Sequence, residues 1–199
     1  AWVSAPYVKP GVPLSQAIRD AVNGLPVEVV VLENHGVIVV ADTMEEIHRL
    51  IDEVESRLDL PMQGAPVVPP APAVPGWRAA PAFASLAHDP VLRARATGGT
   101  YYPDHVVFLG PALPHMNAEA FAALDPAAWP VPAVIVDEVG VYFKDDATPA
   151  QEAMLDCVFQ VLRRIPTSWT LVPIGEAAEE ELLNWDAEKY RQDLAKSAN

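Results

Sequence analysis

The stretch Val27-Glu-Val-Val-Val-Leu-Glu-Asn-His-Gly-Val-Ile-Val-Val40 consists of two apolar runs that are joined by Asn34-His35-Gly36. β-Branched side chains favour strands, and apolar runs without alternation are typical of strands buried on both faces. Glycine and asparagine adopt left-handed or tightly turned backbone conformations at low cost. We therefore expect two buried strands, Val27–Leu32 and Gly36–Val40, with a tight turn between them.

Amphipathic helices are predicted on both sides of these strands. Residues 13–22 place five apolar side chains on one helix face, and Asn23-Gly24 is a typical C-terminal stop signal. After the strands, Asp42 or Thr43 can cap a second helix with glutamates three residues on. This helix carries one apolar stripe, formed by Met44, Ile47, Ile51, Val54 and Leu58. The N-terminal segment therefore has the order helix–strand–strand–helix.

Prolines divide the chain into two segments. Six of them fall between residues 61 and 75, at positions 61, 66, 69, 70, 72 and 75, and residues 61–76 carry no charge. This composition predicts an extended, polyproline-like linker. We expect one domain over residues 1–60, a linker over 61–76 and a C-terminal α/β extension over 77–199.

The C-terminal segment mixes helices and strands without strict alternation, which favours a layered α/β or α+β sheet protein. Helices are expected at 80–95, broken around Asp89-Pro90, and at 118–124, 149–162, 176–183 and 186–196. Strands are expected at 106–109, 133–136, 139–143 and 170–174. Thr148-Pro149-Ala150-Gln151 combines an N-cap, a proline at the first helical position and a glutamine at the third.

Composition excludes several classes of protein. The 199 residues are 51% hydrophobic, which excludes a disordered chain, and 27 acidic against 13 basic residues argue against nucleic-acid or anionic-membrane partners. No apolar run approaches the roughly 20 residues that span a bilayer. The single cysteine, Cys157, excludes an internal disulfide and is interpreted as an inert buried thiol. The start at Ala1-Trp2-Val3-Ser4, without Met or signal peptide, suggests part of a longer polypeptide, and we expect a cytoplasmic location.

Histidines are the main candidates for chemistry. His35 follows an apolar strand, where a rigid sheet can direct a side chain into a cleft, and imidazole is a common metal ligand. The alternative is a histidine in a turn whose ring forms hydrogen bonds with the backbone. The residues alone favour this alternative slightly. Asp104 and His105 form either a polar pair at a site edge or a structural turn. We interpret His48 as a residue on the flank of a helix, His88 as a capping or turn residue, and His115 as an exposed loop residue. Asp137-Glu138 is interpreted as a solvated turn.

Leu32-Glu33-Asn34-His35-Gly36-Val37 resembles the third metal-ligand segment of the class II aldolase/adducin family. In that family two strands meet at an Asn-His-Gly turn, and a helix with an acidic first turn follows, as Asp42-Thr43-Met44-Glu45-Glu46 does here. Lys9-Pro10-Gly11 before the first helix also matches, and the resemblance covers about residues 5–60. The segments Tyr102–Pro111 and Glu188–Arg191 are similar to the C-terminal extension of longer, rhamnulose-phosphate aldolase-type members.

The resemblance implies an α/β/α layered fold with a central, mostly antiparallel sheet flanked by helices, assembled as a homo-oligomer, usually a tetramer. It implies a zinc ion held by three histidines, with His35 as the third ligand and Asn34 and Gly36 shaping the turn. The metal would polarise a carbonyl during retro-aldol cleavage of a small-molecule substrate, a sugar phosphate or related hydroxy-carbonyl compound. Asp104 and His105 are candidates for the wall of the catalytic cleft.

The sequence departs from the family pattern at the other ligands. The family's His-x-His pair and catalytic glutamate lie upstream, but no histidine precedes His35 here and no His-x-His occurs in the chain. Zinc usually takes three or four protein ligands. Two explanations are open: the metal-binding half lies outside this sequence, or the chain is a non-catalytic, adducin-like binding or assembly module. A third is an unrelated α/β protein with a chance Asn-His-Gly turn.

Overall fold

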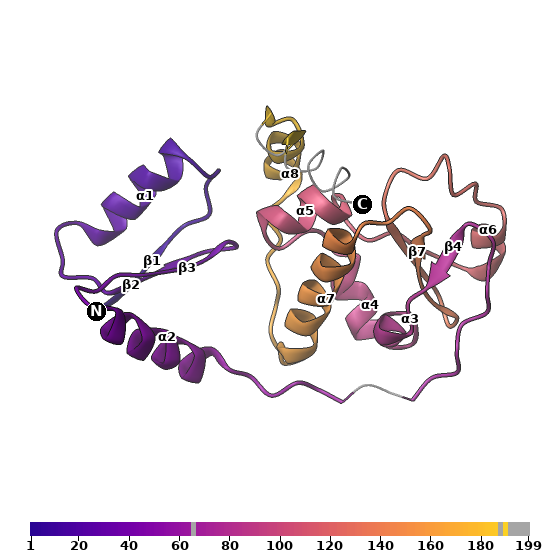
Figure 1. Ribbon diagram of the computed structural model, residues 1–199, viewed down its shortest axis with the longest axis horizontal. Coiled ribbons are helices and arrows are strands. Elements are labelled where there is room, and N and C mark those ends of the chain that lie inside the picture. The colour runs from indigo at the N-terminus through magenta and orange to yellow at the C-terminus, as the bar shows by residue number, and fades with distance from the viewer. Residues whose placement is uncertain (65–66, 187–188, 191–199) are drawn as a thin grey trace. The chain divides into compact units, whose positions relative to one another are not determined.

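The computed structural model describes residues 1–64, 67–186 and 189–190 of the chain. The chain divides into two compact units, Ala1–Pro61 and Met62–Asn199. Figure 1 shows unit 1 in indigo and purple and unit 2 in magenta, orange and yellow. Within the described residues, no helix is long and apolar enough to cross a membrane.

Unit 1 is a small three-stranded sheet with two helices. Its elements are β1 (Trp2–Ala5), α1 (Val12–Val22), β2 (Val29–Leu32), β3 (Gly36–Val39) and α2 (Met44–Leu58). The strand order is β1-β2-β3, with β1 parallel and β3 antiparallel to β2. The two predicted strands are therefore neighbours. Strand β1 was not expected from the sequence, because four residues are too few to show a strand period.

The helices of unit 1 cover opposite faces of the sheet. Successive strand residues point to opposite faces. Val30 and Leu32 of β2 pack with α1 through Leu14 and Ile18, whereas Val29 packs with α2 through Leu50 and Val54. Figure 1 shows the same arrangement, with the three strands between the two helices. This confirms an α/β fold with helices flanking the sheet.

Two predicted burial patterns in unit 1 are wrong. Strand β3 is an edge strand whose residues are exposed or half-buried, with Val37 43% exposed, so it is not buried on both faces. In α2 the buried residues are Leu50 and Val54, and three members of the predicted stripe, Met44, Ile51 and Leu58, are exposed. At 100° per residue these three lie about 80–120° around the helix from Leu50, which packs against the sheet.

Unit 2 contains a four-stranded sheet in the order β4 (Trp77–Ala79), β7 (Gly140–Lys144), β6 (Ala133–Val136) and β5 (His115–Met116). The hairpin predicted at 133–143 is confirmed, since β6 and β7 pair antiparallel. Strand β4 is antiparallel to β7 and β5 is parallel to β6. The helical elements are η1 (Pro81–Phe83), α3 (Ser85–His88), α4 (Pro90–Ala96), α5 (Pro103–Leu109), α6 (Ala118–Ala122), α7 (Pro149–Arg164) and α8 (Glu176–Leu183).

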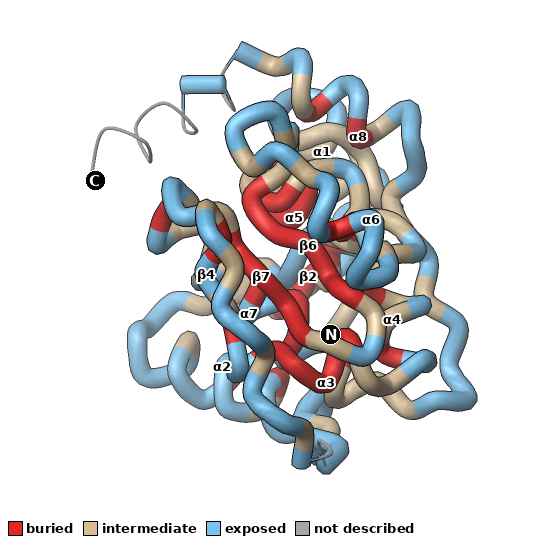
Figure 2. Tube along the Cα trace, turned by 90° about the vertical axis from the view of Figure 1, so that its right-hand side faces the viewer, coloured by how far each residue is buried: buried red, intermediate tan, exposed pale blue. Residues whose placement is uncertain are grey.

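The central strands of unit 2 are buried on both faces. On one face, Ile135 and Phe143 pack against α3, α4 and α7, and on the other Val134 and Tyr142 pack against Phe121 of α6. Figure 2 shows β6 and most of β7 in the colour of buried residues. The apolar sequence of these strands therefore reflects a sheet with a core on each side.

Two helices of unit 2 start where their capping residues in the sequence predicted. Asp89 separates α3 from α4 and its carboxylate accepts hydrogen bonds from the backbone of Val91 and Leu92, as a helix cap does. Thr148 caps α7 and forms a capping box with Gln151.

Three other predictions for unit 2 are wrong. Residues 106–109 belong to helix α5, and residues 170–174 form no strand. Cys157 is exposed, because it lies about 200° around α7 from the buried Leu155.

The proline-rich segment lies against unit 2 where the structure describes it. The hydroxyl of Tyr142 donates to the Pro72 carbonyl over 2.9 Å, and the side chain of Gln63 donates to the Ile165 carbonyl over 2.8 Å. Gly140 leaves room for this segment, because a Cβ there would lie 2.8 Å from the Ala71 side chain. Pro66, most of the predicted helix at 186–196, and Glu188 and Arg191 lie outside the described residues.

Candidate functional site

The turn that presents His35 is held by the register of β2 and β3. Leu32 pairs with Gly36, and the backbone N–H of His35 donates to the Leu32 carbonyl over 3.1 Å. Asn34 has φ 54° and Gly36 has φ 153°, which are the backbone conformations that these two residue types favour. The side chain of His35 is exposed at the end of the hairpin. The imidazole is therefore accessible from solvent and fixed to a regular element.

The described residues do not by themselves fit a zinc centre. They contain no group of three or more histidine, cysteine, aspartate or glutamate side chains that could hold a metal ion. A protein zinc site usually has at least three such ligands. His35 can supply one imidazole, and Asn34 and Gly36 shape the turn rather than contribute ligands.

Asp104 and His105 lie in the first turn of α5, in unit 2, and their surroundings differ. Asp104 is half-buried, whereas His105 is fully buried. The Tyr101 backbone N–H donates to Nδ1 of His105 over 3.3 Å, and Nε2 has no hydrogen-bond partner among the described residues. Burial lowers the pKa of His105 from 6.5 to about 4. Its ring is therefore neutral at pH 7 and enclosed by the rings of Tyr101 and Tyr102.

A charged cluster that sequence reasoning undervalued surrounds the β6–β7 turn. Arg93 of α4 reaches Asp137 over 3.3 Å, and His115 of β5 reaches the same carboxylate over 3.3 Å. Glu138, with φ 58°, lies 3.6 Å from His88. The turn that the sequence predicted to be solvated is therefore linked by polar contacts to three neighbouring elements, α3, α4 and β5. Only proximity in the fold reveals this, because the partners are 22 to 50 positions apart in the sequence.

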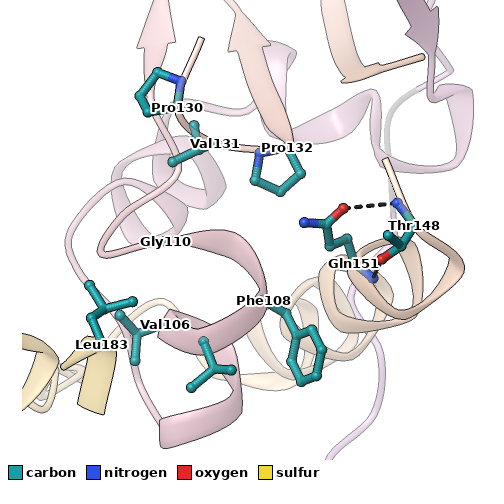
Figure 3. Close-up of a pocket in the computed structure, with 10 residues that line it drawn as sticks. Val106, Phe108, Gly110, Pro130, Val131, Pro132, Thr148, Gln151 and Leu183 are labelled. Atoms are coloured by element: carbon teal, nitrogen blue, oxygen red, sulfur yellow. Dashed lines mark hydrogen bonds between the residues drawn. The ribbon is translucent and has the colours of Figure 1, made fainter. Parts of the chain in front are cut away.

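A cavity of about 280 Å³ opens in unit 2 between α5, the segment before β6, the start of α7 and the end of α8 (Figure 3). Most of its lining side chains are apolar, and Thr148 and Gln151 contribute polar ones; the lining residues are Val106, Val107, Phe108, Gly110, Pro130, Val131, Pro132, Thr148, Gln151 and Leu183. Sequence reasoning recognised Thr148 and Gln151 as a helix cap. It did not reveal the cavity, whose walls come from four separate parts of the chain.

Comparison with known families supports the assignment of unit 1. The fold described above, a sheet with a helix on each face and a histidine at the turn between two strands, defines a layered α/β domain. Residues 1–60 match the family described as the class II aldolase and adducin N-terminal domain. The N-terminal unit is thus similar to the class II aldolase/adducin family. No curated protein and no solved structure matches the chain.

Proposed function

We propose that the chain is part of a class II aldolase-type lyase, in which His35 is one ligand of a zinc centre. The observation that carries the proposal is the exposed imidazole on the Asn34-His35-Gly36 turn of a unit that matches this family. The remaining ligands would come from outside the described residues. The proposed substrate is a sugar phosphate or a related hydroxy-carbonyl compound, and the proposed assembly is a homo-oligomer. A cytoplasmic location stays a prediction from the sequence.

The geometry of the turn is suited to a ligand role. The strand pairs that flank the turn, with Val31 opposite Val37, restrict where the loop of residues 33–35 can move. A metal ligand must be both accessible and held in place, and a side chain at the end of a paired hairpin meets both conditions.

Zinc content of the protein expressed from its complete coding sequence tests this proposal. We expect stoichiometric zinc in the wild type and at least a tenfold loss of bound zinc in His35→Ala. The matched control is His48→Ala, which removes another exposed histidine of unit 1, on α2, and should keep its zinc. Circular dichroism should show the same helix content for all three proteins.

Either of two results would overturn the metal proposal: no zinc at any occupancy in the wild type, or equal zinc in the wild type and His35→Ala. The reaction is tested separately by aldehyde release from a panel of ketose phosphates and related hydroxy-ketones. We expect the zinc-loaded protein to release aldehyde and His35→Ala to release at least tenfold less. A zinc-loaded protein that cleaves none of these compounds would contradict the lyase proposal.

A further inference from the structure

The cavity in unit 2 is small and partly open to solvent, and it has polar side chains at one end. Val106, Phe108, Val131 and Pro132 form apolar walls, and Thr148 and Gln151 of the α7 start form the polar end (Figure 3). No charged side chain is among its lining residues. Ligand sites in proteins commonly combine apolar side chains with a few placed polar groups, and this cavity is at the small end of their size range.

The capping box fixes which atom of Gln151 faces the cavity. The backbone N–H of Thr148 can only donate, and it lies 2.8 Å from the Gln151 amide oxygen. The amide oxygen must therefore face Thr148, and the amide nitrogen must face the other way. Figure 3 shows this nitrogen directed toward the space between Pro132 and α5. Gln151 thus presents an N–H donor to the cavity, and no acceptor within the described residues is bonded to it.

Two further features favour an oxygen acceptor at this position. The N-terminus of α7, a helix of 16 residues, carries partial positive charge, which favours a negatively polarised atom. The hydroxyl of Thr148 is buried and accepts from the backbone of Gln151 over 3.3 Å, so its own hydrogen can be donated elsewhere. A fully charged ligand is disfavoured, because the apolar walls offer it no counter-charge.

We propose that this cavity binds a neutral small molecule whose carbonyl oxygen accepts a hydrogen bond from the Gln151 amide. At about 30 Å³ per water molecule in the liquid, the cavity holds roughly nine water volumes, which matches a ligand of about ten non-hydrogen atoms. This site lies in unit 2 and does not depend on the proposed lyase function.

Fluorine NMR with two probes of the same size tests the proposal on the full chain. The probes are p-fluoroacetophenone, which has a carbonyl group, and p-fluorocumene, which has the same number of non-hydrogen atoms and a methyl group in place of the carbonyl oxygen. We expect both to bind, and the ketone to bind at least about fivefold more tightly, the factor that corresponds to one net hydrogen bond. Absence of binding by either probe, or equal affinity for the two, would overturn the proposal.

The variant Gln151→Glu isolates the donor. Glutamate preserves the capping box, since its carboxylate also accepts from the Thr148 backbone, but it replaces the N–H donor by an acceptor. The preference for the ketone should disappear while the helix content stays the same. Val131→Phe fills the cavity from the segment before β6 and should abolish binding of both probes. A ketone preference that persists in Gln151→Glu, or binding that persists in Val131→Phe, would place the ligand elsewhere and refute the site.

Discussion

His105 illustrates, at the scale of a residue, how burial sets the chemistry of a side chain. The imidazole is fully buried in α5, and its Nδ1 accepts a hydrogen bond from the Tyr101 backbone N–H. Protonation would place a charge where Nε2 has no partner among the residues described. Burial therefore lowers the pKa to about 4. The position is consistent with a structural role, and a catalytic role would require exposure of the ring.

Stability of unit 2 should fall as the pH is lowered from 6.5 toward 4. In this range the unfolded chain binds a proton at His105, whose ordinary pKa is 6.5, whereas the folded chain, with a pKa of about 4, does not. At 1.36 kcal/mol per unit, the loss is about 3 kcal/mol, and above pH 6.5 this group has no effect. Urea unfolding at pH 7 and pH 4.5, followed by hydrogen exchange in unit 2, measures the loss.

Substitution by glutamine identifies the group responsible. His105→Gln keeps an acceptor for the Tyr101 N–H but does not titrate, so its stability should change less between the two pH values. His48→Gln, which replaces an exposed histidine of unit 1, should retain the full wild-type change in unit 2. A His105→Gln protein with the same pH dependence as the wild type would contradict the assignment.

Helix α7 shows, at the scale of an element, that a cap with two reciprocal hydrogen bonds defines where a helix starts. Thr148 accepts from the Gln151 backbone and donates its own backbone N–H to the Gln151 side chain. The last turn carries Arg163 and Arg164, which complement the negative end of the helix dipole. Both ends of α7 are therefore stabilised by residues that belong to the helix itself or flank it.

Removal of the Thr148 hydroxyl should destabilise unit 2. Thr148→Ala leaves the Gln151 N–H without its acceptor and should lower the free energy of unfolding by about 1 kcal/mol, up to 2 kcal/mol. Thr148→Ser keeps the hydroxyl and should remain within a few tenths of a kcal/mol of the wild type. Urea unfolding measures both values. Equal losses in the alanine and serine variants would show that the cap does not act through its hydroxyl.

The two units, at the scale of the whole molecule, each have a hydrophobic core of their own. Leu50 is buried with Val29 in unit 1, and Leu155 is buried with Phe159 in unit 2. Substitutions in separate cores usually have independent effects on stability. A large-to-small substitution in one core should therefore affect the unit that contains it.

Leu50→Ala and Leu155→Ala test this independence as a matched pair. Each should destabilise its own unit by roughly 2–5 kcal/mol, the usual range for a leucine truncated in a core. Hydrogen exchange read by peptide should show faster exchange in β2 for Leu50→Ala and in β6 for Leu155→Ala. Faster exchange in both units for either single substitution would contradict independence.

Much of the fold could be predicted from local patterns in the sequence. The Asn34-His35-Gly36 turn, the break at Asp89 and the hairpin around residues 137–138 all formed as expected. The strand expected at 106–109 is helical, because four apolar residues fit either period and Pro103 starts a helix just before them. For the candidate site, the sequence identified His35 and its turn, but it placed Asp104 and His105 at a cleft edge or a turn without showing that His105 is buried.

The sequence by itself determined the caps and the turns, because each depends on residues within a few positions of one another. Only the tertiary structure decided which apolar side chains of α2 are buried, and that Cys157 lies on the exposed side of α7. It also decided that Gln151 lines a cavity with Phe108 and Pro132. These features depend on contacts between segments distant in the sequence, and a linear pattern of residues does not specify which segments meet.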